Sequence, residues 1–316
     1  MKRAVIFVPG KWRDCWTRGS FSPHPGIVLF NARLWPEFQL ADEALKGYDE
    51  VPYEDVSIMS PCFLTDLDHI GAATLDNILF GKTTWVSGHK NIQPTNIEIS
   101  AFEVIDELID YYLDTKKFPA LEAVVFAGHS AGGQMTQRYA ALKKDGKHED
   151  RVHYWVRLVS YSTATVAHFA KYLKVANPGS LLWLTEDRPK PDEDCEDIDS
   201  YKYGLEDSIP AYALGDANDL GRKGLVDRFL ERNVHYAFGL LDHGAGDTRC
   251  QAMTQGSTHL ERGQNFMAML DDMGGMPKNS TVDYIPGVTH DGNGMVNNDA
   301  GLEKVRHCKL LLSGLD

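Results

Sequence analysis

The chain alternates short, continuous apolar runs with longer segments in which apolar residues recur at helical spacing, and this pattern limits the possible folds most strongly. Continuous apolar runs are typical of strands that are covered on both faces, as in a parallel sheet with helices on either side. The pattern therefore predicts an α/β fold with a mostly parallel central sheet flanked by helices. We expect six strands, at residues 4–8, 56–60, 121–127, near 156–161, 234–241 and 281–288.

A helix with a clear start is expected before the third of these strands. Ser100 and Glu103 have the spacing of a capping box, in which the hydroxyl and the carboxylate each accept a hydrogen bond from a free backbone N–H group. The apolar residues that follow share one helix face; they are Phe102, Ile105, Leu108, Ile109 and Tyr112. A last helix, at about Leu302–Leu312, is expected to close the far end of the sheet.

The alternating pattern stops between residues 175 and 233. This stretch contains four prolines, and its centre, residues 186–207, holds ten acidic residues against three basic ones. The order of aspartates with a central glycine that an EF-hand loop needs is missing, so a solvated surface is the better interpretation. We expect a cap or lid insertion at 175–233, which divides an α/β core into a first part at 1–174 and a second part at 234–316.

The net charge is −13, from 32 basic and 45 acidic residues, and it makes binding to a phosphate backbone unfavourable. No stretch of about 18 apolar residues is present, so we expect neither nucleic acid nor a membrane as a partner. The first apolar run is shorter than the core of a signal peptide, and we expect a cytoplasmic protein. Five cysteines without C-x-x-C spacing indicate neither a zinc site nor a dense disulfide framework.

One motif carries most of the chemical information. The segment Gly128-His129-Ser130-Ala131-Gly132 matches G-x-S-x-G, follows a buried strand and precedes an amphipathic helix, which is the context of a nucleophile elbow. The glycines let strand and helix approach closely, and the turn lifts the serine hydroxyl above the end of the sheet. Glycine-rich phosphate-loop motifs do not fit this segment. We therefore expect Ser130 to be a nucleophile, with the backbone N–H of Ala131 in an oxyanion hole.

A serine nucleophile needs a base, and in this architecture the chain order is serine, acid, histidine. His290 directly follows the strand at 281–288 and lies in a turn-rich stretch that can reach over the strand ends. His307 is expected within the last helix and His235 inside a strand, so both are weaker candidates. The sequence therefore predicts His290 as the base.

The acid that orients the histidine is expected at the tip of a neighbouring strand. Asp242 comes directly after the strand at 234–241, and this place makes it the first choice. Asp247, five residues later, and Asp187, which follows another short apolar run, are the alternatives.

The loop after the first strand is expected to supply a second oxyanion donor. Gly10 is a place where backbone can approach a ligand closely, and we assign the backbone N–H of Lys11 as the donor. Substrate contacts are expected from Gly10 and Trp12 in this loop, from His129 beside the serine, and from Trp183 in the insertion. The insertion also carries Tyr201, Tyr203 and Tyr212 beside Trp183, and an aromatic wall of this kind suits a small, partly apolar substrate.

Several segments give the chain a likeness to a known family. They lie between residues 118 and 291 and include Ala127-Gly128-His129-Ser130-Ala131-Gly132-Gly133-Gln134, Tyr201-Lys202-Tyr203-Gly204-Leu205 and Ile285-Pro286-Gly287-Val288-Thr289-His290-Asp291. In these segments the chain resembles the α/β-hydrolase fold serine hydrolases, and more narrowly a mostly fungal group with the same elbow. The resemblance implies the α/β-hydrolase fold, hydrolysis, and a triad of Ser130, Asp242 and His290. Pro9-Gly10 stands where the family usually has His-Gly.

Together these observations predict a serine hydrolase that cleaves the carboxylic ester of a small molecule through an acyl-enzyme; a lactone or a thioester would use the same groups. The alternatives are an amidase or peptidase, a lyase with the same triad, and a non-catalytic ligand-binding protein. We expect a small-molecule substrate as the partner, and neither a cofactor nor a metal ion.

Overall fold

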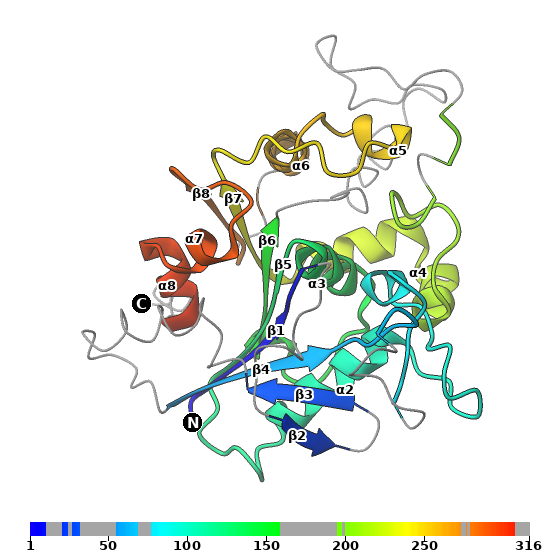
Figure 1. Cartoon of the computed structure of the whole chain (residues 1–316), viewed down its shortest axis with the longest axis vertical. Coiled ribbons are helices and arrows are strands. Elements are labelled where there is room, and N and C mark those ends of the chain that lie inside the picture. Colours follow the sequence, from blue (N-terminus) through cyan, green and yellow to red (C-terminus); the bar gives the residue numbers. More distant parts are fainter. Residues whose placement is uncertain are drawn as a thin grey trace.

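The computed structural model of the chain describes residues 1–10, 21–24, 27–31, 55–68, 77–158, 195–197, 200–272, 276 and 279–306. Their centre is an eight-stranded sheet with the strand order β2-β3-β4-β1-β5-β6-β7-β8 (Figure 1). The strands are β1 (Arg3–Val8), β2 (Phe21–His24), β3 (Ile27–Asn31), β4 (Val56–Cys62), β5 (Ala123–His129), β6 (Val152–Leu158), β7 (Asn233–Gly239) and β8 (Thr281–Ile285).

Six adjacent strands, β4, β1, β5, β6, β7 and β8, run parallel, whereas β2, β3 and β4 pair antiparallel at one edge. This confirms the predicted mostly parallel sheet. In Figure 1, α2, α3 and α4 lie on one side of the sheet and α7 and α8 on the other. Because parallel strands end at the same edge, the loops after β5, β7 and β8 can meet there.

The described helices connect and cover these strands. They are η4 (Thr84–Ser87), α2 (Ala101–Leu113), α3 (Ala131–Leu142), η5 (Glu149–Arg151), α4 (Ala211–Leu230), α5 (Cys250–Met253), α6 (His259–Asp272), α7 (Gly292–Val296) and α8 (Asp299–Arg306). None of these helices is both long enough and apolar enough to cross a membrane.

The start of α2 agrees with the sequence. Ser100 Oγ accepts a hydrogen bond from the backbone N–H of Phe102 at 3.0 Å, and the Ser100 N–H donates to the Glu103 carboxylate at 2.6 Å. The apolar face that the spacing predicted is buried in full. The capping box and the helix are therefore confirmed.

The helix α3 is buried along its whole length. Every residue of this helix is buried, because it packs on β5 and β6 and is covered by α4. The Tyr139 ring meets the rings of Phe102 on α2 and Phe126 on β5 edge-on, with ring centroids 5.5 and 5.2 Å apart. Such pairs add about 0.5–1.5 kcal/mol beyond the burial of apolar area. These contacts hold in place the helix that follows the elbow.

Some strand boundaries differ from the prediction. β5 runs on to His129, so that the strand leads directly into the elbow. β7 and β8 end before the apolar runs do, because Leu241 and Val288 belong to two loops that meet: the Leu241 N–H donates to the Val288 carbonyl at 2.9 Å. The pair β2 and β3 was not expected. Its strands are short and β2 contains Pro23, which is tolerated at a sheet edge but weakens the strand pattern.

The stretch expected to be an insertion contains a long helix. α4 is interrupted at Gly221, whose φ of 63° breaks the helical backbone. Its C-terminal half buries Leu225, Val226 and Phe229 in the same core cluster as the sheet. The division into 1–174, 175–233 and 234–316 stays a prediction, because residues 175–194 lie outside the described part of the chain.

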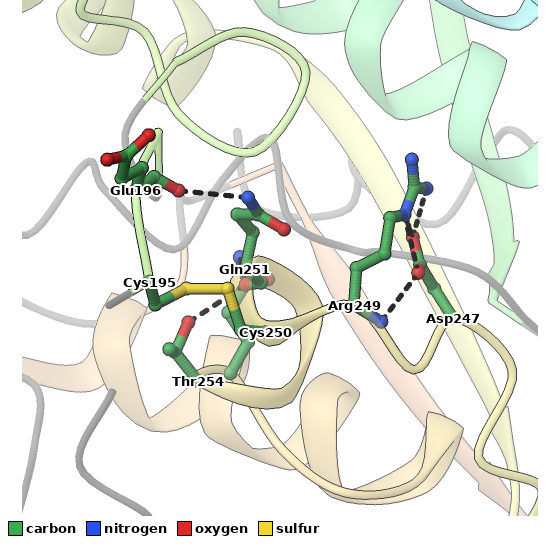
Figure 2. The surroundings of a disulfide bond; sticks show 8 residues. Cys195, Glu196, Asp247, Arg249, Cys250, Gln251 and Thr254 are labelled. Carbon is green, nitrogen blue, oxygen red and sulfur yellow. Dashed lines mark hydrogen bonds and ion pairs between the residues drawn. A yellow bond between two sulfur atoms is a disulfide. The ribbon is translucent and has the colours of Figure 1, made fainter. Parts of the chain in front are cut away.

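A disulfide bond joins Cys195 to Cys250, at the start of α5 (Figure 2). The Gln251 side-chain amide also donates to the Glu196 carbonyl at 2.9 Å. A hydrogen bond therefore joins the same two chain segments as the disulfide. Cys62 is disulfide-bonded as well. Cysteine spacing in the sequence gave no sign of these pairings, because the two partners of the first bond lie 55 residues apart.

Candidate active site

Ser130 lies at the sharp turn between β5 and α3. Its backbone has φ 57° and ψ −119°, a positive φ that residues other than glycine rarely adopt and that marks strain at functional sites. The turn is tight enough that a Cβ on Gly128 would lie 2.1 Å from the carbonyl oxygen of Gly132. Glycine at this position therefore allows the elbow, and the elbow places the serine at the end of the strand.

The hydroxyl of Ser130 lies within hydrogen-bond distance of an imidazole. Ser130 Oγ and His290 Nε2 are 3.2 Å apart, and 38% of the His290 side chain is exposed. His290 lies between β8 and α7. Asp291 fixes this loop, because its carboxylate accepts hydrogen bonds from the N–H groups of Asn293 and Gly294 at the start of α7. The structure thus brings together the serine and the histidine that the sequence selected.

Asp242 lies on the other side of the His290 ring. Its Oδ2 is 3.3 Å from His290 Nδ1, and its side chain is 1% exposed. Burial raises the pKa of Asp242, but the hydrogen bonds from His259 and His290 outweigh burial and lower the pKa to about 2. The carboxylate is therefore ionised at neutral pH, and it can stabilise a positively charged imidazole.

Asp247, the first alternative for the acid, has different partners. Its carboxylate accepts hydrogen bonds from Arg249 Nε at 2.8 Å and from the Tyr203 hydroxyl at 2.9 Å. Figure 2 shows Arg249 facing this carboxylate, close to the disulfide. The structure therefore assigns Asp247 to a salt bridge and gives it no hydrogen bond to His290 among the contacts of the described residues. Asp187, the second alternative, lies outside the described residues.

Two groups of the expected oxyanion hole lie beside Ser130. Ala131 begins α3, and the first N–H groups of a helix have no partner within it, so the Ala131 N–H has no acceptor in α3. Gly10 follows β1 closely, and a Cβ on it would lie 3.2 Å from Ser130 Cβ and 3.5 Å from Ser130 Oγ. Lys11, Trp12 and Trp183 lie outside the described residues, so their expected roles stay predictions.

His129 precedes the serine and is partly exposed. Its ring centroid is 5.6 Å from that of His290, and its Nδ1 is buried without a hydrogen-bond partner in the described structure. Burial lowers the pKa of His129 well below its usual value, and the charge of Arg157 lowers it further. The ring is therefore neutral at pH 7. Its place beside Ser130 and His290 is compatible with the expected substrate contact.

A second histidine contacts the same carboxylate, and sequence reasoning missed it. His259 Nδ1 lies 2.8 Å from Asp242 Oδ1, and the rings of His259 and His290 are 4.9 Å apart. His259 is the first residue of α6, which follows α5 and the loop that begins at Asp242. No motif in the sequence marks this position, and only the fold places it beside the acid.

Asp242, His259 and His290 are also residue types that bind metal ions, with ligand atoms within 4.8 Å of one another. Here both Nδ1 atoms face the two oxygens of the carboxylate at hydrogen-bond distance, and His290 Nε2 faces Ser130. An ion would have to replace these hydrogen bonds. The arrangement therefore suits proton transfer better than metal coordination.

Comparison with known proteins supports the fold. No protein-family model and no curated protein matches the chain. Among solved structures it is similar to poly(aspartic acid) hydrolase-1 from Sphingomonas sp. KT-1, with 18% identity and a TM-score of 0.54 over 93% of this chain and 85% of that one. It is also similar to a poly(3-hydroxybutyrate) depolymerase from Bordetella parapertussis, with 13% identity and a TM-score of 0.51 over 96% and 83%.

Neither of these two structures comes from a fungus, so the narrower resemblance to a fungal group stays a prediction. The parallel sheet, the strained serine between β5 and α3, and the two similar structures agree on the architecture. The chain has the α/β-hydrolase fold.

Proposed function

We propose that this protein is a serine hydrolase that cleaves the carboxylic ester, lactone or thioester of a small, partly apolar molecule. The observation that carries the proposal is the continuous contact from Asp242 through His290 to Ser130, at 3.3 and 3.2 Å. The three residues come from three separate loops at one edge of the sheet, and a serine hydroxyl needs such partners to become a nucleophile.

The order of the contacts gives the reaction. Ser130 donates its proton to His290 Nε2 while its oxygen attacks the substrate carbonyl. The imidazole becomes positively charged, and Asp242 stabilises it through the Nδ1–H hydrogen bond. His290 then donates the proton to the leaving alcohol, which leaves an acyl group on Ser130. A water molecule, activated by His290, releases the acid and restores the serine.

The negative charge on the carbonyl oxygen needs donors that are in place before the reaction. The Ala131 N–H at the start of α3 supplies one of them, because the helix begins at the serine. The second is assigned to the Lys11 N–H, since Gly10 brings the loop after β1 next to Ser130. No step of this scheme needs a cofactor or a metal ion.

Substrate contacts are assigned to Gly10, Trp12, His129 and Trp183. Gly10 and His129 support this assignment, because both lie beside the serine and histidine. The two similar structures are a poly(aspartic acid) hydrolase and a poly(3-hydroxybutyrate) depolymerase, and their names point to different polymers. The triad of this chain could act on an ester or on an amide, so amides are tested beside the esters.

Two experiments test the proposal. A fluorophosphonate probe should label the wild-type protein on Ser130 and leave Ser130→Ala unlabelled. p-Nitrophenyl esters of rising acyl length, followed by lactones, thioesters and amides, should show turnover that Ser130→Ala lacks. If the wild-type protein reacts with neither the probe nor the substrates, a ligand-binding role is indicated. If it converts a substrate into products without net addition of water, it is a lyase.

We also propose that the protein works in an oxidising compartment. Cys195 and Cys250 are joined, and Cys62 is disulfide-bonded too. Disulfides persist in oxidising compartments and are rare in the cytosol, which favours such a location over the cytoplasm expected from the sequence. Protein taken from its native source into an alkylating reagent should keep Cys195 and Cys250 unmodified; alkylation of both would support the cytoplasm.

A further inference from the structure

The Asp242 carboxylate has a second partner that the proposed reaction does not use. Its Oδ2 accepts from His290 Nδ1 at 3.3 Å, while its Oδ1 is closer to His259 Nδ1, at 2.8 Å. An ionised carboxylate can only accept hydrogen bonds, so His259 must donate through Nδ1–H. The two imidazoles therefore occupy the two oxygens of one buried acid.

His259 is held to the Asp242 loop by backbone as well. The His259 N–H donates to the Gly244 carbonyl at 2.9 Å, and the Leu260 N–H donates to the Asp242 carbonyl at 3.2 Å. The fit is close, because a Cβ on Gly244 would lie 3.1 Å from His259 Cε1. The start of α6 and the loop after β7 thus form one unit around the carboxylate.

This unit has a direct effect on the orientation of the acid. A carboxylate held at one oxygen can turn about its Cβ–Cγ bond, whereas one held at both oxygens cannot turn without breaking a hydrogen bond. The His259 ring also lies 4.9 Å from the His290 ring, at an angle of 44°, and so supports the base from the side. His259 is 8% exposed, which removes competing water from the contact.

We propose that His259 is a positioning residue of the triad: its Nδ1–H fixes the Asp242 carboxylate so that the other oxygen holds His290 in line with Ser130. This inference rests on the proposed serine hydrolase activity. His259 acts through Asp242 and has no part in binding substrate. The hydrogen bond should therefore contribute to kcat and not to KM.

A pair of substitutions isolates the donor. In His259→Asn the amide nitrogen occupies nearly the place of Nδ1, whereas in His259→Gln it is one bond further from the backbone. With a p-nitrophenyl ester, we expect His259→Gln to lose kcat by about 10- to 100-fold with KM unchanged, a range typical of removing an outer partner of a functional group. His259→Asn should keep most of the activity. Equal losses in the two variants would contradict the proposal.

A double variant shows whether His259 acts through the acid. If it does, His259→Gln should cost nothing further in kcat once Asp242→Asn is present, because the carboxylate that it positions is gone. Losses that multiply would mean that His259 acts independently, and the proposal would be wrong. This comparison is made within one background, so a general loss of stability does not imitate the expected result.

His153→Gln serves as the matched control, because it too moves the amide nitrogen one bond away from the place of Nδ1. His153 is also buried and hydrogen-bonded to another histidine, His235, at 3.0 Å, but it lies at the opposite end of the parallel strands. This variant should lower the melting temperature without changing kcat per folded molecule. Full activity in His259→Gln, together with an inactive Ser130→Ala, would overturn the role of His259 alone. A wild-type protein without activity or labelling would overturn the hydrolase and this inference together.

Discussion

Gly132 lies so close to Val8 that a Cβ on the glycine would be 2.0 Å from the Val8 carbonyl oxygen. The contact joins the first turn of α3 to the end of β1, and no rearrangement of a flexible side chain can relieve it. We expect Gly132→Ala to destabilise the fold by at least about 1–3 kcal/mol, the usual cost of overpacking. Urea unfolding of the two proteins measures this difference.

Gly215→Ala provides the control for the loss of glycine itself. Gly215 lies in α4, is exposed, and has no atom within 4 Å of the place a Cβ would take. Alanine should therefore stabilise the helix there by about 0.5–1 kcal/mol. If both variants destabilise the protein equally, the close approach of α3 to β1 does not explain the effect at Gly132.

Ser130→Ala should remove the proposed nucleophile and leave the fold intact. Loss of a triad serine lowers kcat by roughly 10⁶-fold in a comparable hydrolase. The melting temperature should not fall, since alanine is smaller than serine and, like serine, has an unbranched Cβ. Steady-state kinetics with an ester and a thermal melt test this together; activity retained above one thousandth of the wild type would exclude Ser130.

The two aspartates after β7 should respond differently to the same change. Asp242→Asn should lower kcat by roughly 10⁴-fold, because the amide cannot balance the charge of the imidazolium. Asp247→Asn should leave kcat unchanged and weaken the contact with Arg249 and Tyr203. Kinetics of both variants on one ester decide between them: a larger loss at Asp247 would mean that the acid is wrongly assigned.

Asp247 should also stabilise the fold at neutral pH, and this contribution should be lost in acid. Burial raises its pKa, but the hydrogen bonds from Arg249 and Tyr203 lower it to about 2, below the value of the unfolded chain. A folded pKa below the unfolded one stabilises the protein above about pH 4, and this contribution, about 2 kcal/mol, is lost as the pH falls towards 2. Unfolding free energies at pH 7, 4 and 2.5 should fall less steeply for Asp247→Asn than for the wild type.

The disulfide should stabilise the fold without taking part in catalysis. Cross-linking two residues that are 55 positions apart restricts the unfolded chain, and the chain-entropy model gives about 4 kcal/mol for a loop of this size. Cys195→Ser and Cys250→Ser should each lower the unfolding free energy by up to this amount. Each single variant should match the double variant; additive losses would mean that the two sulfurs act separately.

The sequence predicted the parallel part of the fold because buried strands leave continuous apolar runs. β1, β4, β5 and β7 all lie where such runs occur. The edge was missed, since β2 has four residues with Pro23 among them, and β3 is only five residues long although residues 27–30 are apolar. α4 was missed for another reason: it buries few side chains, among them Leu225 and Phe229, so its hydrophobic spacing is weak.

The site was predictable where chemistry leaves a local pattern. G-x-S-x-G marks Ser130 because only glycine tolerates the close contacts around it, and His290 and Asp242 follow the ends of their strands. His259 has no such mark. Its contact with Asp242 depends on how α6 returns to the loop after β7, which is a property of tertiary structure alone.

The Cys195–Cys250 bond encloses α4, β7 and Asp242 in one covalent ring of chain, and leaves Ser130 and His290 outside it. A protease that cuts once anywhere within this ring yields two polypeptides that remain attached through sulfur. Nicked protein would run as a single band on a gel without thiol and as two bands with it. The fragment bearing the acid would thus stay tethered to the rest of the molecule after such damage.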